Sequence, residues 1–369
     1  MTKMPNPLIS VTVCVRDGVH WIDDCLQSLV EQTYRPLEII AVDDGSTDGS
    51  TEKLTQWQNY ESDIKITILT QGPKGLSAGR QLALNNSDGT WVAITDIDVR
   101  PSSTWIEKLY EKTLPIDENE KVVAVTGRTI FAKADDLVSQ LRSVEISLKY
   151  RSRPRRTSLA NGPCSMFERS AITEIGGFNP KWYHAEDMEV SLKLIENGGT
   201  IVYNPEAIVE HVPESSRSRF LAKRSRDARA HTRIVRKYPR KKRSGPGFDF
   251  IGSSTIVLGV LPLWVCLLVS VIPFTFYFTI TDDKSIENIR TWWQTNMLFI
   301  SLAIILIQEI IFVRGPLGAV IRGSVINSGK NRVIVYFGLK ILTIQWSLAL
   351  WKGLIPVSYT HLTLPTRRF

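Results

Sequence analysis

The chain has 369 residues, of which 22% are charged, so it is long enough for one large domain and an appendage and has an ordinary globular composition. Its cysteines, at positions 14, 25, 164 and 266, lack the paired spacing of metal ligands, which argues against a zinc site or a disulfide framework. Residues 217–243 carry a large excess of Lys and Arg within a net charge of +8. Such a run suits nucleic acid or an anionic membrane surface. Because an apolar stretch follows it directly, we predict contact with anionic membrane lipid and no nucleic acid.

Strand-like and helix-like segments alternate through the first half of the chain. Residues 8–15 and 37–42 predict buried strands, and residues 21–32 predict an amphipathic helix between them. Strand, helix and strand at this spacing indicate a right-handed parallel crossover. Residues 91–95 and 122–126 add two further strands. The predicted fold class is therefore α/β, with an open mixed, mostly parallel sheet flanked by helices, and ligands are expected beyond the carboxyl ends of its strands.

The first acidic motif, Asp43-Asp44-Gly45-Ser46, follows the second predicted strand and precedes a helix-like segment at residues 50–57. A turn with local hydrogen bonds to the backbone explains an isolated motif of this kind. The alternative is that a carboxylate of the motif accepts a hydrogen bond from an N–H group of a nucleobase at the strand end. The motif alone leaves both interpretations open.

The second motif, Asp96-Ile97-Asp98, ends the strand at residues 91–95. Alternation along the chain places both carboxylates on one side and returns Ile97 to the core. Two neighbouring carboxylates repel each other unless they share a cation, and Mg²⁺ or Mn²⁺ prefers oxygen ligands and neutralises a departing diphosphate. Two surface aspartates in a turn are the alternative.

The third motif, Glu186-Asp187, begins a predicted helix that ends before Gly198-Gly199. A carboxylate at this position favours the helix dipole, and it can also act as a general base that takes the proton of an acceptor hydroxyl. His211 is either a packing residue or a metal ligand beside Asp98. Lys74 and Arg80 either begin a solvated helix or contact phosphate or base.

These motifs occur together with several others in a fixed order. They are the strand at 8–15, Glu38–Ser46, Gly75–Arg80, Asp96 with Asp98, Asn161–Arg169 before Gly176-Gly177-Phe178, Glu186-Asp187, and Pro205–His211. This combination, over residues 8–211, resembles the family 2 glycosyltransferases with a GT-A fold.

The resemblance implies a role for each acidic motif. Asp44 would contact the nucleobase of a UDP- or GDP-sugar, Asp96 its ribose or the metal region, Asp98 the metal, and Asp187 would be the general base. Gln81 departs from the family pattern, so the nucleotide stays open. The Gln-x-x-Arg-Trp motif of processive synthases is absent after Asp187, which argues against a polymerase.

The last third of the chain contains three apolar runs, at residues 255–280, 296–313 and 333–351, each near the ~20 residues that cross a bilayer. The connection at 281–290 is slightly acidic and the one at 314–332 is basic, which predicts that the first lies outside and the second inside the cell. The N-terminus lacks a secretory signal pattern. We therefore expect a multi-pass cell-membrane protein with a cytoplasmic catalytic domain.

The sequence predicts four regions: a GT-A domain at 1–216, a basic interfacial segment at 217–250, a membrane domain at 254–353 with about three transmembrane helices, and a non-native tail at 357–369. The tail matches the translation of a transposon-end sequencing adapter. Apolar residues between the arginines of the basic segment would enter the lipid, and Arg226 and Arg229, with Glu186, would lie on the acceptor side.

The predicted function is an inverting, metal-dependent sugar transfer from a nucleotide-sugar to a lipid-linked or membrane-proximal glycan, with Asp187 as base. One alternative is a polyprenyl-phosphate sugar transferase, in which phosphate replaces hydroxyl as the nucleophile. Another is a membrane scaffold that binds nucleotide-sugar without turnover.

Overall fold

A computed structural model of the chain describes residues 5–355, apart from positions 119, 152, 183, 215, 240, 242–256, 258, 261, 263–264, 266–275, 278–286, 315 and 329–330. The chain divides into two compact units. The first contains residues 1–132, 149–213 and 230–250, and the second contains residues 133–148, 214–229 and 251–369. The C-terminal part of the chain thus forms a unit with two segments from earlier in the sequence.

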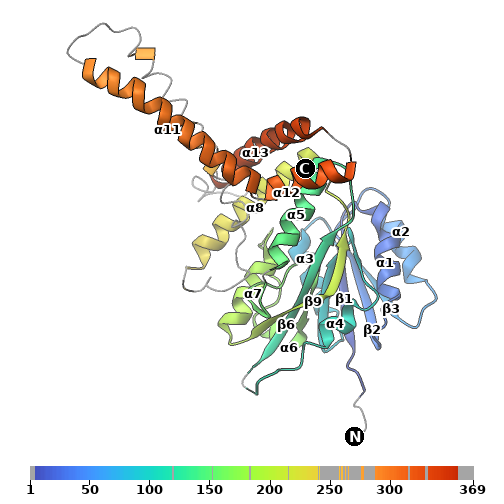
Figure 1. Cartoon of the computed structure of the whole chain (residues 1–369). Coiled ribbons are helices and arrows are strands. Elements are labelled where there is room, and N and C mark those ends of the chain that lie inside the picture. The colour runs from blue at the N-terminus through green and yellow to red at the C-terminus, as the bar shows by residue number, and fades with distance from the viewer. Residues whose placement is uncertain are drawn as a thin grey trace. The chain divides into compact units, whose positions relative to one another are not determined.

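A nine-stranded mixed sheet forms the centre of the first unit (Figure 1). Its strands are β1 (Ile9–Val15), β2 (Leu37–Asp43), β3 (Lys65–Thr70), β4 (Trp91–Asp96), β5 (Val99–Pro101), β6 (Val122–Phe131), β7 (Arg156–Thr157), β8 (Ser165–Glu168) and β9 (Thr200–His211). The order across the sheet is β3-β2-β1-β4-β8-β6-β9-β5, and β7 pairs with β9. The predicted strands therefore exist, and the α/β fold class is confirmed.

Strand direction differs between the two halves of the sheet. The pairs β1–β2, β2–β3 and β1–β4 are parallel, as the sequence predicted. Strand β8 runs antiparallel to both of its neighbours, β4 and β6, because the chain enters it at the edge where β4 ends. Strands β5 and β7 are also antiparallel to β9, whereas β6 and β9 are parallel. The sheet is mixed as expected, but the prediction that it is mostly parallel holds only for its first half.

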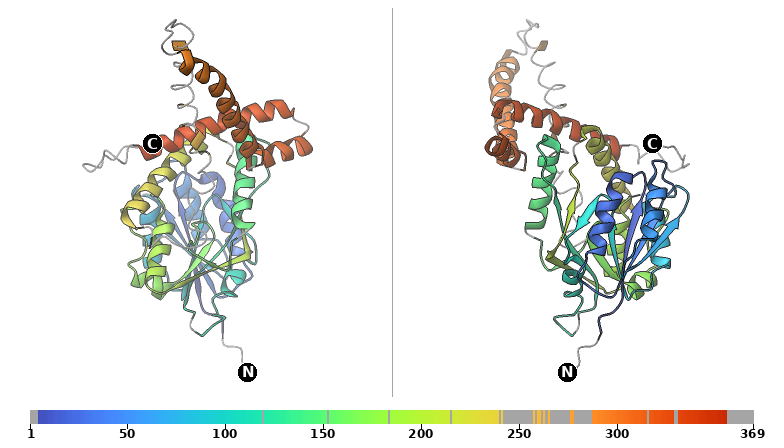
Figure 2. Two further views of the ribbon diagram at one scale, coloured as in Figure 1. Left: turned by 60° about the vertical axis from the view of Figure 1, so that its left-hand side comes forward. Right: turned by 90° about the vertical axis from the view of Figure 1, so that its right-hand side faces the viewer.

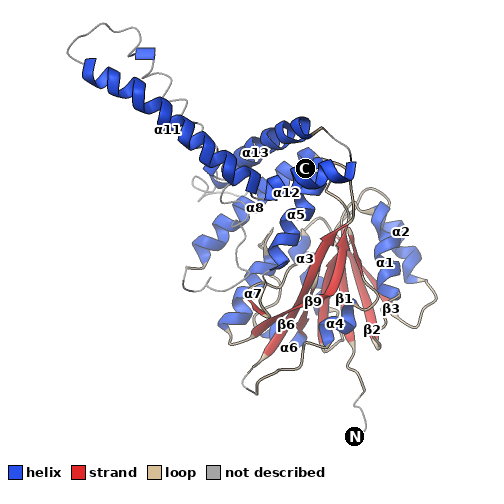
Figure 3. Cartoon of the chain, in the orientation of Figure 1, coloured by secondary structure: helices blue, strands red, loops and turns tan. Residues whose placement is uncertain are grey.

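Helices cover both faces of this sheet (Figure 3). They are η1 (Val19–Trp21), α1 (Ile22–Val30), α2 (Ser50–Gln58), α3 (Leu76–Asn85), α4 (Trp105–Tyr110), α6 (Arg169–Glu174) and α7 (Glu186–Glu196), with α5 (Leu137–Arg151) and α8 (Arg217–Lys237) at the unit boundaries. Side chains of α1, α2 and α4 form one core with the sheet, and those of α3, α6 and α7 pack on its other face. Because both faces are covered, β2 is buried along its whole length, as expected for an apolar central strand.

The cysteines of the first unit are packing residues. Cys25 and Cys164 are buried, Cys14 is partly so, and all three are free thiols. Burial raises the pKa of the Cys14 and Cys164 thiols to about 12 and raises that of Cys25 as well. These thiols are therefore protonated and unreactive at neutral pH. Cys266 lies outside the described residues.

A buried carboxylate anchors the loop before β7. Both oxygens of Glu120 accept hydrogen bonds from Arg155 at 2.6 and 2.8 Å, and Arg156 donates a further one at 2.9 Å. The hydrogen bonds from Arg155 are the main reason that the pKa of Glu120 falls from 4.5 to about 2. The ionised form of Glu120 therefore stabilises the fold.

We expect Glu120→Gln to lower the free energy of unfolding by ~1.5–3 kcal/mol at neutral pH, the usual contribution of hydrogen bonds to a charged group. Because the folded pKa lies below the unfolded one, this contribution is complete above pH 4.5 and disappears as the pH falls through about 2. Thermal denaturation of the wild type and Glu120→Gln between pH 6 and pH 3 should show that the difference between their melting temperatures becomes smaller as the pH falls. Glu118→Gln, an exposed change two residues away, is the control and should leave the melting temperature unchanged.

The second unit is helical. It contains α11 (Glu287–Arg314), α12 (Pro316–Ser328) and α13 (Arg332–Leu354), together with the parts of α5 and α8 that belong to it. Its core includes Val138 and Leu141 of α5, Phe220 of α8, and Leu339 and Trp346 of α13. Figure 2 shows α11 running away from α12 and α13 rather than along them.

The three predicted membrane spans are not confirmed. By length and composition, one described helix, α13, could cross a membrane, and 44% of its most apolar window is buried within the protein. Parts of α11 and α12 pass the same test together as a bent pair. Most of the run at 255–280 lies outside the described residues, as do the loop at 281–286 and the tail at 357–369.

The prediction that apolar side chains of the basic segment enter the lipid is wrong for two of them. Phe220 is fully buried against Trp346 in the second unit, with ring centroids 5.4 Å apart. Ile234 is fully buried in the first unit with Trp182 and Met188. Protein rather than lipid covers these side chains, because α8 is an amphipathic helix whose apolar face packs on its own chain.

Candidate active site

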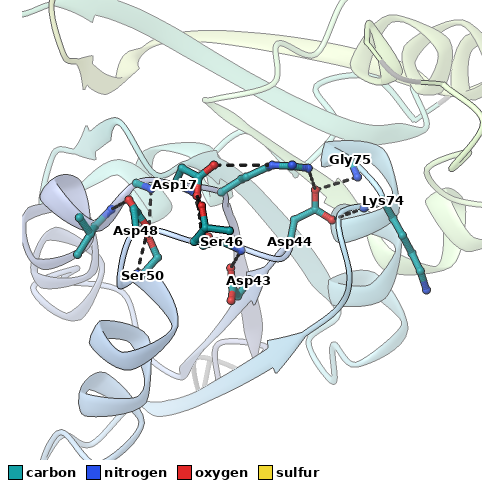
Figure 4. Close-up of polar contacts among 12 residues, drawn as sticks. Asp17, Asp43, Asp44, Ser46, Asp48, Ser50, Lys74 and Gly75 are labelled. Carbon is teal, nitrogen blue, oxygen red and sulfur yellow. Dashed lines mark hydrogen bonds and ion pairs between the residues drawn. The ribbon is translucent and has the colours of Figure 1, made fainter. Parts of the chain in front are cut away.

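Asp44 lies where β2 ends and is held by the loop before α3 (Figure 4). Its Oδ1 accepts hydrogen bonds from the Lys74 amide at 2.8 Å and from Gln71 Nε2 at 2.7 Å, and its Oδ2 accepts one from the Gly75 amide at 2.8 Å. The guanidinium of Arg16 approaches Oδ2 at 3.6 Å. Asp44 is 3% exposed, so its carboxylate is fixed in place and fixes the loop in turn.

The neighbouring carboxylates of this region shape the turn. Asp43 accepts hydrogen bonds from the Ser46 amide at 3.0 Å and the Thr51 hydroxyl at 2.5 Å. Asp48 accepts from the amides of Ser50 and Val19. The interpretation of the motif as a turn with local hydrogen bonds is therefore correct for Asp43 and Asp48, whereas Asp44 bonds to a distant loop.

Arg80 connects the second acidic motif to the third. Its Nη2 donates to Asp96 Oδ1 at 2.8 Å and its Nη1 to Glu186 Oε1 at 2.5 Å, although these carboxylates are far apart in sequence. The side chain is 2% exposed. Burial acts to lower the pKa of this guanidinium, but Glu186 and Asp96 outweigh it and hold the pKa above its ordinary value. Arg80 thus forms a buried charged bridge between two carboxylates, and its predicted contact with the donor stays a prediction.

Gly162 joins Arg80 to Asp187. Its carbonyl oxygen accepts a hydrogen bond from Arg80 Nη2 at 3.2 Å, and its amide donates to Asp187 Oδ2 at 3.0 Å. A side chain at position 162 would lie 3.1 Å from the guanidinium, so glycine permits this close approach. Asp187 Oδ1 accepts from the Met188 amide at 2.8 Å. The carboxylate is therefore oriented, and it remains partly exposed to solvent.

The residue directly before helix α7 has a strained backbone. This residue, Ala185, has a φ of 63°, in the left-handed region that costs a residue with a side chain roughly 1–2 kcal/mol. This conformation turns the chain so that Glu186 enters the core at 3% exposure while Asp187 stays at the surface. Strain of this kind collects at functional sites.

Asp98 and His211 come together as the sequence predicted. His211 Nε2 lies 3.4 Å from Asp98 Oδ2, across the antiparallel pair of β5 and β9. Its ring stacks on Phe131 at 4.9 Å between centroids, and Nδ1 lies 2.8 Å from the carbonyl oxygen of Val212. A carbonyl can only accept, so Nδ1 carries a proton, and Nε2 is the ring nitrogen that faces the carboxylate.

This arrangement fits a divalent cation. A lone pair and a carboxylate that face each other repel unless a proton or a cation lies between them, and a hydrogen bond from Nδ1 to a carbonyl is the usual support of a metal-binding histidine. The described residues contain no preformed group of three or more His, Cys, Asp or Glu side chains that could hold an ion. Two protein ligands with positions left for phosphate oxygens suit Mg²⁺ or Mn²⁺.

The structure does not test the predicted roles of Lys74, Arg226 and Arg229. The amide of Lys74 holds Asp44, while its exposed side chain points away from that cluster (Figure 4). Arg226 and Arg229 lie on α8, the first half-buried and the second exposed. Donor contact by Lys74 and acceptor contact by the two arginines stay predictions.

Sequence reasoning missed three residues of this region. Arg16 lies between Asp17 and Asp44, and Gly162 holds Arg80 and Asp187. Asn161 anchors the same loop, because its side-chain amide donates to Thr126, Gly127 and Tyr150. The motif at 161–169 was noted, but nothing in its spacing showed that its backbone connects two acidic motifs.

Fold and site together define a nucleotide-binding type of α/β domain, with carboxylates gathered where the strands end. Residues 10–176 match the family model "Glycosyl transferase family 2". Among curated proteins, the glycosyltransferase GlyA of Streptococcus pneumoniae is 38% identical over 129 residues, 35% of this chain and 18% of that protein. The pre-mycofactocin glycosyltransferase of Mycobacterium tuberculosis is 28% identical over 211 residues, 55% of this chain and 42% of that protein.

Over residues 10–176 the chain is therefore similar to the glycosyltransferase family 2 domain. The matched segments span well under two thirds of the length of the first curated relatives. A solved structure, the mannosyltransferase PcManGT of Pyrobaculum calidifontis with GDP-Man and Mn²⁺, has the same fold: the TM-score is 0.54 at 19% identity, over 96% of this chain and 88% of that one.

Proposed function

We propose that the protein transfers a sugar from a UDP- or GDP-sugar to an acceptor hydroxyl with inversion at the anomeric carbon. The observation that carries this proposal is the bridge from Asp96 through Arg80 to Glu186, which brings the second and third acidic motifs to one place beside Gly162. A donor held near Asp96 then lies close to a carboxylate, Asp187, that is oriented and open to solvent.

Each group has a separate task in this proposal. The loop that Asp44 holds in place forms the end of the site that binds the nucleobase. Asp98 and His211 would hold Mg²⁺ or Mn²⁺, which neutralises charge on the departing nucleoside diphosphate. Asp187 accepts the proton of the acceptor hydroxyl as the new glycosidic bond forms, so the nucleophile gains negative character only when it attacks. The Mn²⁺ and GDP-mannose of PcManGT agree with this class of donor and cofactor.

The acceptor in this proposal is a lipid-linked or membrane-proximal glycan. Its support is the basic helix α8, with exposed Arg229 and Arg233, and the apolar helices α11 and α13. A polyprenyl-phosphate acceptor is the second candidate, because a phosphate nucleophile needs no general base. Purified protein that transfers to polyprenyl phosphate with Asp187→Asn as active as the wild type would favour that candidate.

The direct test is a donor screen with purified full-length protein in detergent, scored by released nucleoside diphosphate. We expect release from at least one UDP- or GDP-sugar, dependent on divalent metal and strongly reduced by Asp187→Asn. Binding of nucleotide-sugar without any release, in the presence of a membrane extract as acceptor source, would instead support a non-catalytic scaffold.

We expect Asp98→Ala to weaken binding of Mn²⁺ by at least ~10-fold while the melting temperature stays nearly unchanged, since an oriented ligand is lost from a partly exposed position. Titration of nucleotide-loaded protein with Mn²⁺, followed by electron paramagnetic resonance, measures this directly. Asp88→Ala is the matched control, because Asp88 is an exposed carboxylate just before β4 begins. Unchanged Mn²⁺ affinity in Asp98→Ala would remove Asp98 from the metal site.

A further inference from the structure

Helix α13 has two faces of different character along its whole length. One face, with Val335, Leu339, Leu342, Trp346 and Leu350, is buried in the second unit. The opposite face presents large apolar side chains at helical spacing. These are Phe337, Ile341, Ile344 and Leu348, which are 40–59% exposed. A water-soluble surface does not normally carry a continuous apolar stripe of this length, so this face is an interaction surface.

The buried face of α13 lies along charged amphipathic helices. Near its start, an added Cβ at Gly338 would lie 2.9 Å from Leu137 of α5, and near its end one at Gly353 would lie 2.2 Å from the Ser225 carbonyl of α8. Helix α13 thus contacts α5 near its start and α8 near its end, so two different helices cover its buried face.

Charged groups lie at the middle of α13. Arg217 Nε donates to Gln345 Oε1 at 2.6 Å, and Gln345 is near the centre of a helix that runs from Arg332 to Leu354. Arg219, next to it on α8, is exposed. If α13 crossed a bilayer, these guanidinium groups would be carried into the hydrocarbon, where a charged side chain is strongly unfavourable.

Further charged groups of the second unit add to that cost. Arg142 Nε lies 3.1 Å from Glu214 Oε2, and Lys223 Nζ lies 3.5 Å from the same carboxylate. Glu309 of α11 pairs with Lys340 of α13. A network of charged side chains loses little hydration free energy at a membrane surface, because headgroups and water remain near. The same network is strongly unfavourable in hydrocarbon.

We infer that α13, the helix most suited by composition to span a membrane, instead lies in the plane of the bilayer surface. Its exposed apolar face enters the boundary between headgroups and acyl chains, and the basic side chains at its ends, Arg332 and Lys352, contact anionic phospholipid headgroups. Basic groups near such a surface are attracted by its negative potential. This inference rests on the proposed membrane location of the enzyme and adds a second, surface mode of attachment.

Depth within the bilayer tests the inference. The protein with a fluorophore attached at Ile344→Cys, in a background of Cys14→Ser and Cys266→Ser with the buried Cys25 and Cys164 left in place, is reconstituted into vesicles of phosphatidylcholine and phosphatidylglycerol. Ile344 is at mid-helix, so an in-plane helix places it ~5–10 Å below the headgroups. We expect quenchers on shallow acyl positions to act more strongly than quenchers at the bilayer centre. Stronger quenching from the centre, or none from any lipid quencher, overturns the inference.

Sidedness gives an independent measurement. Arg332 and Lys352 are exposed and lie about 30 Å apart at ~1.5 Å per residue, which equals the hydrocarbon thickness. With Arg332→Cys and Lys352→Cys, we expect a membrane-impermeant maleimide to label both only after permeabilisation, in protein recovered from the membrane fraction. Labelling of one of them in intact cells identifies a span and overturns the inference. Nucleoside diphosphate release in detergent does not depend on this geometry, so it reports separately on the proposed function.

Discussion

Replacing Asp187 by Asn should lower kcat by ~10²–10⁴-fold, the usual contribution of a positioned general base. Asp187 is fixed by two amide donors, those of Gly162 and Met188, one on each carboxylate oxygen. An asparagine side chain keeps the shape and has only one acceptor oxygen, so its amino group must face one of these donors. We therefore expect a loss of ~1–3 kcal/mol in stability as well, from the unsatisfied donor.

The effects of Asp187→Asn on kcat and on stability can be measured separately. Donor affinity, measured by calorimetry with a UDP- or GDP-sugar, should stay within a few-fold of the wild type, and the melting temperature should fall by only a few degrees. Asp88→Asn makes the same chemical change at an exposed site and should alter neither quantity. If the rate is unchanged while donor affinity collapses, Asp187 binds the donor and the base is another group.

Replacing Arg80 should have the largest effect on stability. The guanidinium is buried and its loss leaves Glu186, 3% exposed, as an uncompensated charge, which typically costs ~3–5 kcal/mol. Lysine should rescue little, because a single ammonium cannot donate to Asp96, Glu186 and Gly162 in the fixed fork of a guanidinium. Thermal denaturation of Arg80→Met and Arg80→Lys in detergent measures both losses.

A double variant distinguishes positioning from stability. Arg80→Met with Glu186→Leu removes both buried charges, and we expect it to recover much of the stability that Arg80→Met loses. Activity should not recover, because Asp96 and the Gly162 loop lose their common partner. A double variant with normal kcat would show that the bridge serves the fold alone.

The amino-acid sequence by itself determined the local elements and the position of each acidic motif. Runs of β-branched residues such as residues 37–42 form central strands wherever both faces are covered, and Gly198-Gly199 ends the helix that Glu186 begins, because these preferences act within a few residues. Asp98 and His211 were paired correctly, since Asp98 follows β4, His211 is the last residue of β9, and these two strands end at one edge of the sheet.

Only the tertiary structure decided what each buried or exposed group contacts. In the sequence, a single arginine in a helix suggests a phosphate ligand. In the structure, Arg80 is buried and forms ion pairs with two carboxylates. Phe220 and Ile234 are apolar residues among arginines, and the sequence shows that they avoid water without showing whether protein or lipid covers them. The same holds for α13. Its hydrophobicity shows that exposure to water is unfavourable, but it does not show whether the helix would cross a bilayer or lie in its plane. The inferred orientation of α13 rests on the contact of Arg217 with Gln345, two residues 128 positions apart in the sequence.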